Sequence, residues 1–210
     1  MRISIIDSGI GNIGSVKNML KKIGYESIIH KDPPPNFNSN LIILPGVGTF
    51  DNGIKRLREL GWDKYLDQFR QNREKKILGI CLGMQLLCDQ SEEGVLKGLS
   101  FIPGKFVKFK FNDDTIKVPH MGWNFVDFKQ NEFFNEKLII EKSKFYFVHS
   151  YKYDHVNSDY IYGKTNYGGN YFPSIIGNKN IIGVQFHPEK SHKCGMNLCK
   201  VLLKAISSEK

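Results

Sequence analysis

Short runs of apolar residues alternate with stretches of helical periodicity along the first half of the chain. Leu41 to Leu44 and Lys76 to Ile80 are compact apolar runs, which is typical of strands that are buried on both faces. Between Ile13 and Ile23 the apolar residues recur at helical spacing, and Gly24 ends the pattern. Strands that alternate with helices indicate a parallel sheet with helices on both faces. We expect strands over residues 2–7, 27–30, 41–44 and 76–80, and helices over residues 13–23, 50–60, 62–73 and 82–87.

The second half of the chain is predicted to be rich in strands. Turn residues such as Asn112 to Asp114 and Gly168 to Asn170 separate several of them, and an amphipathic helix over residues 192–206 closes the chain. The sequence has no internal repeat or low-complexity linker, so we expect one domain over residues 1–210. Its predicted class is α/β, with a doubly wound mixed sheet and helices on both faces. The expected strands are 101–111, 115–118, 125–128, 145–148, 159–164, 174–176 and 180–186.

The net charge of +9 and the pI of about 9.3 raise the question of nucleic-acid binding. However, the basic residues are mostly lysines spread along the chain, and the densest cluster alternates with phenylalanines, as in a half-buried strand. A basic rim that faces an anionic substrate or an acidic partner is the preferred interpretation. We see neither a signal peptide nor an apolar run of roughly 18 residues, and therefore expect a cytoplasmic protein without a membrane segment.

Four cysteines are present, and no two of them form a CxxC pair, so a zinc ribbon or thioredoxin-like motif is not expected. Cys88 and Cys199 lie in apolar helical patterns and are predicted to be small buried hydrophobes. We expect neither a metal nor a cofactor. Cys81 stands apart because of its flanking residues.

The segment from Gly79 to Gly83 has the form G-x-C-x-G, between a predicted strand and a predicted helix. This is the cysteine version of the G-x-S-x-G nucleophile elbow, in which glycines allow a sharp turn that exposes the central side chain. The start of the following helix favours the thiolate form of Cys81. The backbone N–H of Leu82 is expected to point to where an oxyanion would form.

A second candidate is the segment His187-Pro188-Glu189, which follows an apolar strand. Proline biases His187 toward an extended conformation, and residues two apart in an extended chain lie on the same side. Glu189 can therefore orient the imidazole of His187, as the acid of a Cys-His-acid triad does. The alternative for His187 is a structural histidine.

A third candidate is the turn from Pro45 to Gly48, which also ends a buried strand. Ligand sites of doubly wound sheets gather at the carboxyl ends of strands, and a glycine-rich turn can aim N–H groups at an oxyanion. An ordinary strand-to-helix turn is the alternative. A phosphate site at Gly9 to Gly14 is less favoured, because this GxGxxG lacks an acidic partner after the second strand.

Together these segments resemble the class I glutamine amidotransferases, and within them the glutaminase subunit of imidazole glycerol phosphate synthase. The resemblance covers nearly the whole chain and implies a flavodoxin-like architecture. The residues after the triad also resemble paralogues that feed ammonia to a sugar amidotransferase for surface polysaccharides, and Ser8 stands where the family commonly has tyrosine. The matching segments are 6–12, 44–48, 79–87, 118–124, 147–151 and 183–191.

The resemblance implies that the enzyme hydrolyses L-glutamine to glutamate and ammonia, with Cys81, His187 and Glu189 as its triad. It also implies a separate cyclase subunit with a (β/α)8 barrel, which receives the ammonia in histidine biosynthesis as a heterodimer partner. The open alternatives are a peptidase or deglycase on a related fold and a non-catalytic binding module. The implied oxyanion N–H groups are those of Leu82 and Val47, the implied glutamine-binding residues are Gly46, Gln85, Glu93, His149, Ser150 and Tyr151, and the implied interface residues are Asn12, Pro119, Met121, Trp123, Tyr146 and Lys190. For Trp123, a core position is the alternative.

Overall fold

The computed structural model describes residues 1–210 except 37, 132, 135–142, 156, 209 and 210. The main sheet of this part of the chain consists of β1 (Ile3–Ile6), β2 (Ser27–His30), β3 (Leu41–Gly46), β4 (Lys76–Cys81), β8 (Asp127–Phe128), β11 (Ile161–Tyr167), β12 (Asn170–Asn178) and β13 (Ile181–Val184). The strand order is β2-β1-β3-β4-β13-β12-β11-β8. Neighbours from β2 to β13 pair in parallel, and the remaining pairs are antiparallel. The predicted mixed sheet is confirmed.

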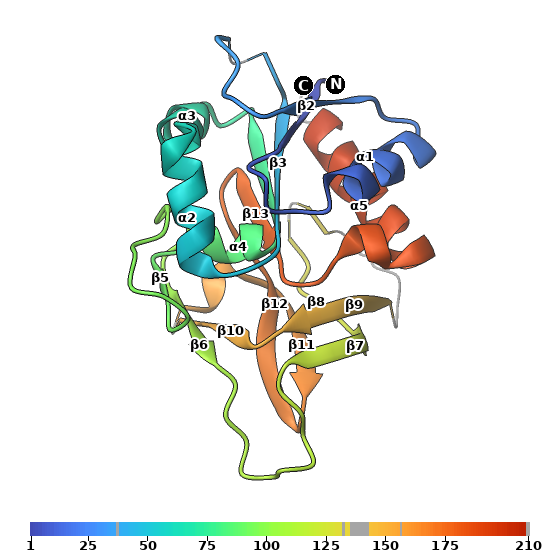
Figure 1. Ribbon diagram of the computed structural model, residues 1–210. Coiled ribbons are helices and arrows are strands. Elements are labelled where there is room, and N and C mark those ends of the chain that lie inside the picture. The colour runs from blue at the N-terminus through green and yellow to red at the C-terminus, as the bar shows by residue number, and fades with distance from the viewer. Residues whose placement is uncertain (37, 132, 135–142, 156, 209–210) are drawn as a thin grey trace.

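Helices cover both faces of the parallel strands (Figure 1). One layer contains α1 (Ile13–Lys22) and α5 (His192–Ser208), and the other contains α2 (Phe50–Glu59), α3 (Trp62–Phe69) and α4 (Leu82–Leu86). The alternation of β3 explains the two layers: Leu41 and Ile43 belong to the core cluster under α1 and α5, whereas Ile42 and Leu44 belong to the cluster under α2 and α3. The apolar run of β3 therefore contributes side chains to both core clusters.

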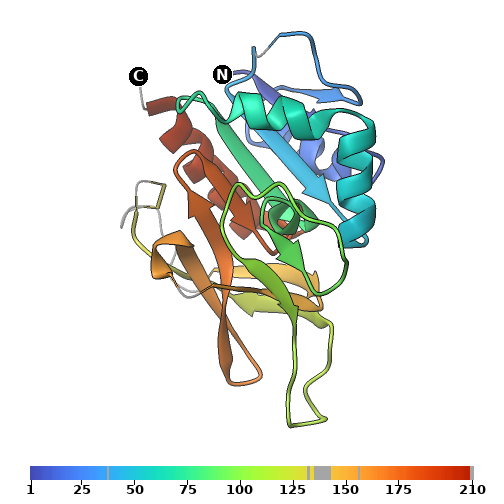
Figure 2. The same ribbon diagram turned by 90° about the vertical axis from the view of Figure 1, so that its left-hand side faces the viewer.

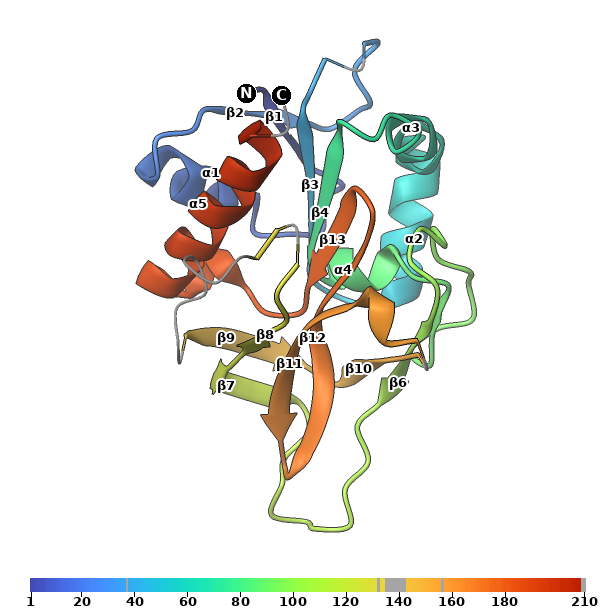
Figure 3. The ribbon, with the colours of Figure 1, turned by 180° about the vertical axis from the view of Figure 1, so that it is seen from behind.

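Smaller sheets lie beyond the carboxyl ends of the parallel strands, next to the long β11–β12 hairpin (Figures 2 and 3). One contains β5 (Gln90–Ser91), β6 (Lys105–Lys108) and β10 (Tyr151–Asp154), and the other pairs β7 (His120–Phe125) with β9 (Lys144–His149). Two short 3-10 helices complete the described elements, η1 (Ser158–Tyr160) and η2 (Pro188–Lys190). The two smaller sheets thus face the edge of the main sheet at which the strands that carry the candidate residues end.

Several predicted boundaries are wrong. The strand expected over residues 115–118 is a turn, because Asp113 accepts hydrogen bonds from both the N–H and the hydroxyl of Thr115, which competes with strand pairing. Within 101–111 only β6 forms, after a break at Gly104, whose φ is 122°. The helix expected over 62–73 ends at Phe69, and residues 158–160 form η1 instead of the start of a strand. The strands β5 and β10 and the first five residues of β7 were not predicted.

Candidate active site

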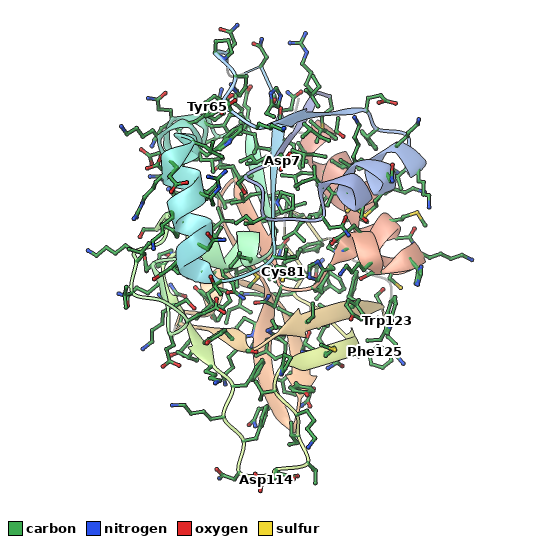
Figure 4. The ribbon with its side chains drawn as sticks, viewed as in Figure 1. Asp7, Tyr65, Cys81, Asp114, Trp123 and Phe125 are labelled. Atoms are coloured by element: carbon green, nitrogen blue, oxygen red, sulfur yellow. The ribbon has the colours of Figure 1, made fainter. Side chains whose placement is uncertain are left out.

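The register of three neighbouring strands brings the predicted site residues to one edge of the sheet. In the parallel pairing of β3 with β4, Gly46 lies opposite Cys81. In the pairing of β13 with β4, Val184 lies opposite Ile80. The glycine-rich turn, the cysteine and the histidine that follows β13 therefore leave the sheet side by side. Figure 4 shows Cys81 near the middle of the molecule, between the helical layers and the smaller sheets.

The backbone at Cys81 is bent as a nucleophile elbow requires. Its φ is 54° and its ψ is −111°, a conformation that costs an L-residue about 1–3 kcal/mol and is typical of functional sites. Gly83 permits the tight turn, because a Cβ there would overlap the carbonyl oxygen of Leu44. Leu82 is the first residue of α4, where a helix provides no acceptor for the backbone N–H. That N–H is therefore available beside the sulfur.

His187 is paired with Glu189 as expected. The distance from Nδ1 of His187 to Oε1 of Glu189 is 2.7 Å, and each side chain is 2% exposed. The backbone of His187 is also held, since its N–H donates to the carbonyl of Tyr146 at 2.9 Å and its carbonyl accepts from the hydroxyl of Ser191 at 2.6 Å. Ser191 in turn accepts the N–H of Tyr146 at 3.0 Å. The imidazole is thus fixed from both sides.

The second ring nitrogen of His187 faces away from Glu189. Nε2 is buried and has no hydrogen-bond partner among the described residues. Burial alone would lower the pKa of His187, but the neighbouring Cys81 thiol and the Glu189 carboxylate raise it to about 10. The ring therefore favours the protonated form, with one N–H directed away from Glu189 and available for transfer.

The side chain of Gln185, for which the sequence predicted no role, contacts the nucleophile. Nε2 of Gln185 donates to the sulfur of Cys81 at 3.8 Å, and Oε1 of Gln185 accepts from Gln85 at 3.2 Å. Gln185 is fully buried. Its position two residues before His187 in an extended segment was a signal that could have identified it.

The sulfur of Cys81 lies in a cleft of about 280 Å³. The cleft gathers most of the residues that resemblance assigned to glutamine and the oxyanion. Gly46 does not line it but packs beneath it, since a Cβ there would come within 2.9 Å of Leu82. Pro119, predicted for the partner interface, lines the cleft as well. Its walls are Val47, Gly48, Cys81, Leu82, Gln85, Glu93, Pro119, Val148, His149, Ser150, Tyr151 and His187.

A larger cavity of about 500 Å³ lies between α1 and the start of α5. Glu189 contributes to its wall, but Cys81 and His187 do not. The smaller cleft is the one that contains the nucleophile, so it is the candidate active site.

Glu93 connects the wall of the cleft to the turn after β3. Its Oε2 accepts the backbone N–H of Phe50 at 2.8 Å, at the start of α2. Burial raises the pKa of Glu93, this N–H opposes the shift, and nearby Asp51 adds to it. The carboxylate therefore helps to place the chain that follows Val47 and Gly48.

The residues predicted for a partner interface include an exposed apolar row on β7. The side chains of Met121 and Trp123 are 62% and 45% exposed, so the alternative of a core position for Trp123 is wrong. Phe125, 42% exposed, extends the row and was not predicted. Figure 4 shows Trp123 and Phe125 on the side of the molecule that carries α1 and α5.

The other predicted interface residues lie near this row or at the start of α1. Trp123 is 6.1 Å from the ring of Tyr146, and the ammonium of Lys190 lies 5.7 Å above that ring. Asn12 is exposed and caps α1 by accepting the N–H of Ser15 at 3.4 Å. Trp123 also stacks on His192 at 5.3 Å, a contact that the sequence did not indicate.

Within the described part of the chain, no three His, Cys, Asp or Glu side chains converge in a way that could hold a metal ion. None of its helices has both the length and the apolar character needed to cross a membrane.

Comparisons with known proteins agree with the site geometry. The family model for glutamine amidotransferase class-I matches residues 4–200. Imidazole glycerol phosphate synthase subunit HisH 2 of Methanococcus maripaludis is 50% identical over 202 residues, which cover 96% of this chain and 98% of the relative. A protein with the same printed name from Pseudomonas aeruginosa is 44% identical over 198 residues, covering 94% of this chain and 96% of the relative.

A solved structure titled as a glutamine amidotransferase superimposes with a TM-score of 0.74 at 15% identity, covering 98% of both chains, and thus supports the fold. The family match and the two relatives extend over nearly the entire chain. The chain therefore belongs to the class I glutamine amidotransferases, and within them to the group whose curated members are named imidazole glycerol phosphate synthase subunit HisH.

Proposed function

We propose that this chain is a glutaminase subunit that hydrolyses L-glutamine to glutamate and ammonia, as one amidotransferase domain over residues 1–210. The observation that carries the proposal is the convergence of three strand ends. Cys81 on a strained elbow, His187, and the turn at Val47 all border one cleft, and Nε2 of His187 has no hydrogen-bond partner in the described part of the chain. Cys-His-acid geometry of this kind performs acyl transfer through a covalent intermediate.

In the first half of the reaction, the thiolate of Cys81 attacks the side-chain carboxamide carbon of glutamine. The N–H groups of Leu82 and Val47 stabilise the tetrahedral oxyanion. The protonated Nε2 of His187 donates its proton to the amide nitrogen as the carbon–nitrogen bond breaks, and ammonia leaves. A thioester between Cys81 and the glutamyl group remains.

In the second half, the now neutral imidazole of His187 takes a proton from water, whose oxygen attacks the thioester carbon. The carbon–sulfur bond breaks, glutamate leaves, and the thiolate–imidazolium pair is restored. Glu189 holds Nδ1–H of His187 throughout, which keeps Nε2 directed at the reacting atoms.

The substrate residues are proposed from their positions in the cleft. Gln85, Glu93 and the 149–151 segment of His149, Ser150 and Tyr151 surround the space next to Cys81. Polar groups at fixed positions in a partly apolar cleft are what orient a small polar ligand. Gly46 contributes by its lack of a side chain, which lets the turn lie against Leu82.

The acceptor of the ammonia is proposed to be a separate cyclase subunit of the (β/α)8 barrel type, in the cytoplasm. The relatives carry the name of imidazole glycerol phosphate synthase, and the analogous product here is imidazole glycerol phosphate with AICAR, in histidine biosynthesis. The partner docks on the row of Met121 and Trp123, with Asn12, Pro119, Tyr146 and Lys190 around it. Exposed aromatic and methionine side chains are enriched in the cores of such interfaces.

The direct test is the release of glutamate by the parent chain and by Cys81→Ser, each with and without the cyclase and its nucleotide. We expect little activity from the isolated chain, strong stimulation by the loaded cyclase, and no turnover in Cys81→Ser with an unchanged circular dichroism spectrum. Release of glutamate by Cys81→Ser at the parent's rate would disprove the role of the nucleophile. Hydrolysis of peptides in place of glutamine would favour a peptidase.

A sugar amidotransferase remains the second candidate acceptor because of Ser8 and the residues after the triad. Ser8 is buried at the carboxyl end of β1, its hydroxyl has no hydrogen-bond partner among the described residues, and it does not line the cleft. The proposed triad is therefore the same for both acceptors. Stimulation by a sugar amidotransferase and not by the cyclase would select the second one.

A further inference from the structure

Two histidines outside the proposed triad form a buried pair behind the cleft. His120 on β7 and His149 at the end of β9 are 2% and 5% exposed. The ring of His120 lies between those of Tyr167, at 4.0 Å and 27°, and Phe147, at 4.7 Å and 24°. Phe172 contacts both imidazoles, at 5.7 Å and 5.2 Å. An aromatic enclosure of this kind removes water from both rings, so their polar atoms depend on each other.

The hydrogen bonds of the pair have one consistent direction. The carbonyl of Tyr151 can only accept, so Nδ1 of His149, 2.8 Å away, carries the proton. Nε2 of His149 must then accept, and Nδ1 of His120, at 3.0 Å, donates to it. Nε2 of His120 accepts in turn from the amide of Asn124 at 3.2 Å, which also donates to the carbonyl of Asn166 at 2.8 Å. We call Asn124, His120 and His149 the histidine chain.

Both rings are neutral in this arrangement, since a proton on either Nε2 would face another donor. Burial lowers the pKa of His120 to about 4 and that of His149 to about 3, in agreement with neutral rings. The chain of hydrogen bonds is therefore intact at neutral pH.

The histidine chain ends at the proposed glutamine site. The bond from His149 to the carbonyl of Tyr151 closes the corner at Ser150, where the backbone leaves β9 and enters β10. All three residues of this corner line the cleft with Cys81. A shift of the His149 ring would move the corner, because the ring is hydrogen-bonded to the backbone carbonyl of Tyr151.

The other end of the histidine chain lies on the strand proposed to meet the partner. Along β7, His120 and Asn124 alternate with Met121 and Trp123, so the two sets of side chains leave opposite faces of the strand. Any displacement of the exposed row on β7 therefore also displaces His120, the donor to His149, and Asn124, the donor to His120.

We propose that His120 and Asn124 are positioning residues that hold His149 and the Ser150 corner in the glutamine-binding arrangement and connect that corner to the partner-facing strand. This proposal rests on the proposed glutaminase function. It assigns to the two residues no contact with the substrate.

Two substitutions separate the two hydrogen bonds of His120. In His120→Asn the amide nitrogen reaches the place of Nδ1 and keeps the donor to His149. In His120→Gln the amide reaches the place of Nε2, keeps the contact with Asn124 and leaves His149 without its donor. The control is Phe172→Leu, which loosens the packing around both rings without removing a hydrogen bond.

In complex with the partner, we expect His120→Gln to raise the KM for glutamine about tenfold, with a smaller change in kcat, as the loss of one buried hydrogen bond predicts. His120→Asn and Phe172→Leu should keep KM within about twofold of the parent. Asn124→Leu should reduce the factor of stimulation by the partner about fivefold. Equal KM values in His120→Gln and His120→Asn, or an equal rise in Phe172→Leu, would overturn the positioning role, and an unchanged stimulation factor in Asn124→Leu would overturn the connection to β7.

Nitrogen-15 spectra of the imidazoles give a readout that does not depend on activity. The histidine chain predicts that both rings are neutral and carry their proton on Nδ1. Protons on Nε2 in the parent would contradict the arrangement itself. A parent complex that releases no glutamate would contradict the proposed function, and the spectra would still decide whether the hydrogen bonds run as described.

Discussion

At the scale of single residues, the pair of His187 and Glu189 decides the protonation of the proposed site. The carboxylate lies 2.7 Å from Nδ1, and together with Cys81 it overcomes the effect of burial and raises the pKa of His187. The raised pKa keeps His187 protonated, and the departing ammonia takes this proton. Activity is therefore expected to fall as the pH rises through the pKa of His187 in the folded protein. Cys81 and Glu189 together thus move the alkaline limit of the reaction to higher pH, and Glu189 contributes both its hydrogen bond and its charge.

Glu189→Gln should therefore lower kcat about 10²- to 10⁴-fold and move the alkaline limb of the pH–rate profile to lower pH. The amide can still accept from Nδ1, but the negative charge that stabilises the imidazolium is lost. The measurement is the initial rate of glutamate release by the complex across pH, with Glu59→Gln as the control, since that carboxylate only pairs with Arg56 on the surface. An alkaline limb that does not move would contradict the role of the charge.

The histidine chain predicts a loss of stability in mild acid. The folded pKa values of His120 and His149 lie below the usual 6.5, so as the pH falls below about 6.5 the unfolded chain binds protons that the folded chain excludes. The charge of His187 also repels a proton on His149 and so lowers the pKa of His149 further. The other nearby cation, the ammonium of Lys152, lies over the ring of Phe109, which contacts His149.

Urea unfolding at pH 7.5 and pH 5 measures this effect. The parent should lose about 2 kcal/mol more of its unfolding free energy between the two pH values than His120→Gln does, because the variant has one histidine of lowered pKa fewer. An equal loss in both proteins would show that the buried rings do not titrate as described.

At the scale of elements, the close packing of α4 on β3 holds the elbow in place. Gly83 is the contact point, because a Cβ there would overlap the Leu44 carbonyl. Gly83→Ala should cost about 3 kcal/mol or more of unfolding free energy, since the backbone of β3 cannot yield. The matched control is Gly14→Ala in α1, where nothing lies within 4 Å of the added carbon.

Gly14→Ala should be neutral or stabilise by about 0.4–1 kcal/mol, because Gly14 is exposed in the first turn of α1 and alanine has less conformational freedom to lose on folding than glycine. Chemical denaturation of both variants gives the comparison. A Gly83→Ala protein as stable as Gly14→Ala would contradict the packing of α4 against β3.

The elements that the sequence predicted best are those with local signals. The buried strands and the elbow at Cys81 follow from apolar runs and flanking glycines, and His187 with Glu189 follows from a proline and a spacing of two. The hydrogen bond between Phe50 and Glu93 joins residues 43 positions apart, and the one between Gln85 and Gln185 joins residues 100 positions apart. No local sequence pattern contains either pair. Their geometry depends on strand order, which a single sequence does not specify.

At the scale of the whole molecule, the row of apolar side chains on β7 is exposed to solvent in the isolated chain, which is unfavourable unless a partner covers it. Met121, Trp123 and Phe125 are all more than two-fifths exposed and follow one another on one face of the strand. Large apolar groups arranged contiguously mark interaction surfaces. The row lies beside Tyr146 and Lys190, next to the segment that holds His187.

Trp123→Ala should weaken binding of the cyclase subunit about tenfold or more, because a central aromatic side chain contributes strongly to an interface. Titration calorimetry with the partner measures the Kd. Ile28→Ala is the matched control, since Ile28 is 60% exposed on β2, the far edge strand of the main sheet. Equal affinities for both variants would place the interface elsewhere.

The role of Cys81 as the nucleophile is tested most directly by covalent labelling of the intact complex with an electrophilic glutamine analogue, followed by mass spectrometry. One label per chain is predicted, on Cys81, and an excess of glutamine should prevent it. Cys88 and Cys199 should remain unlabelled, because burial raises the pKa of both thiols, that of Cys199 to about 12. A folded, partner-bound chain that takes the label on another cysteine, or on none, would contradict the assignment of Cys81 as the glutaminase nucleophile.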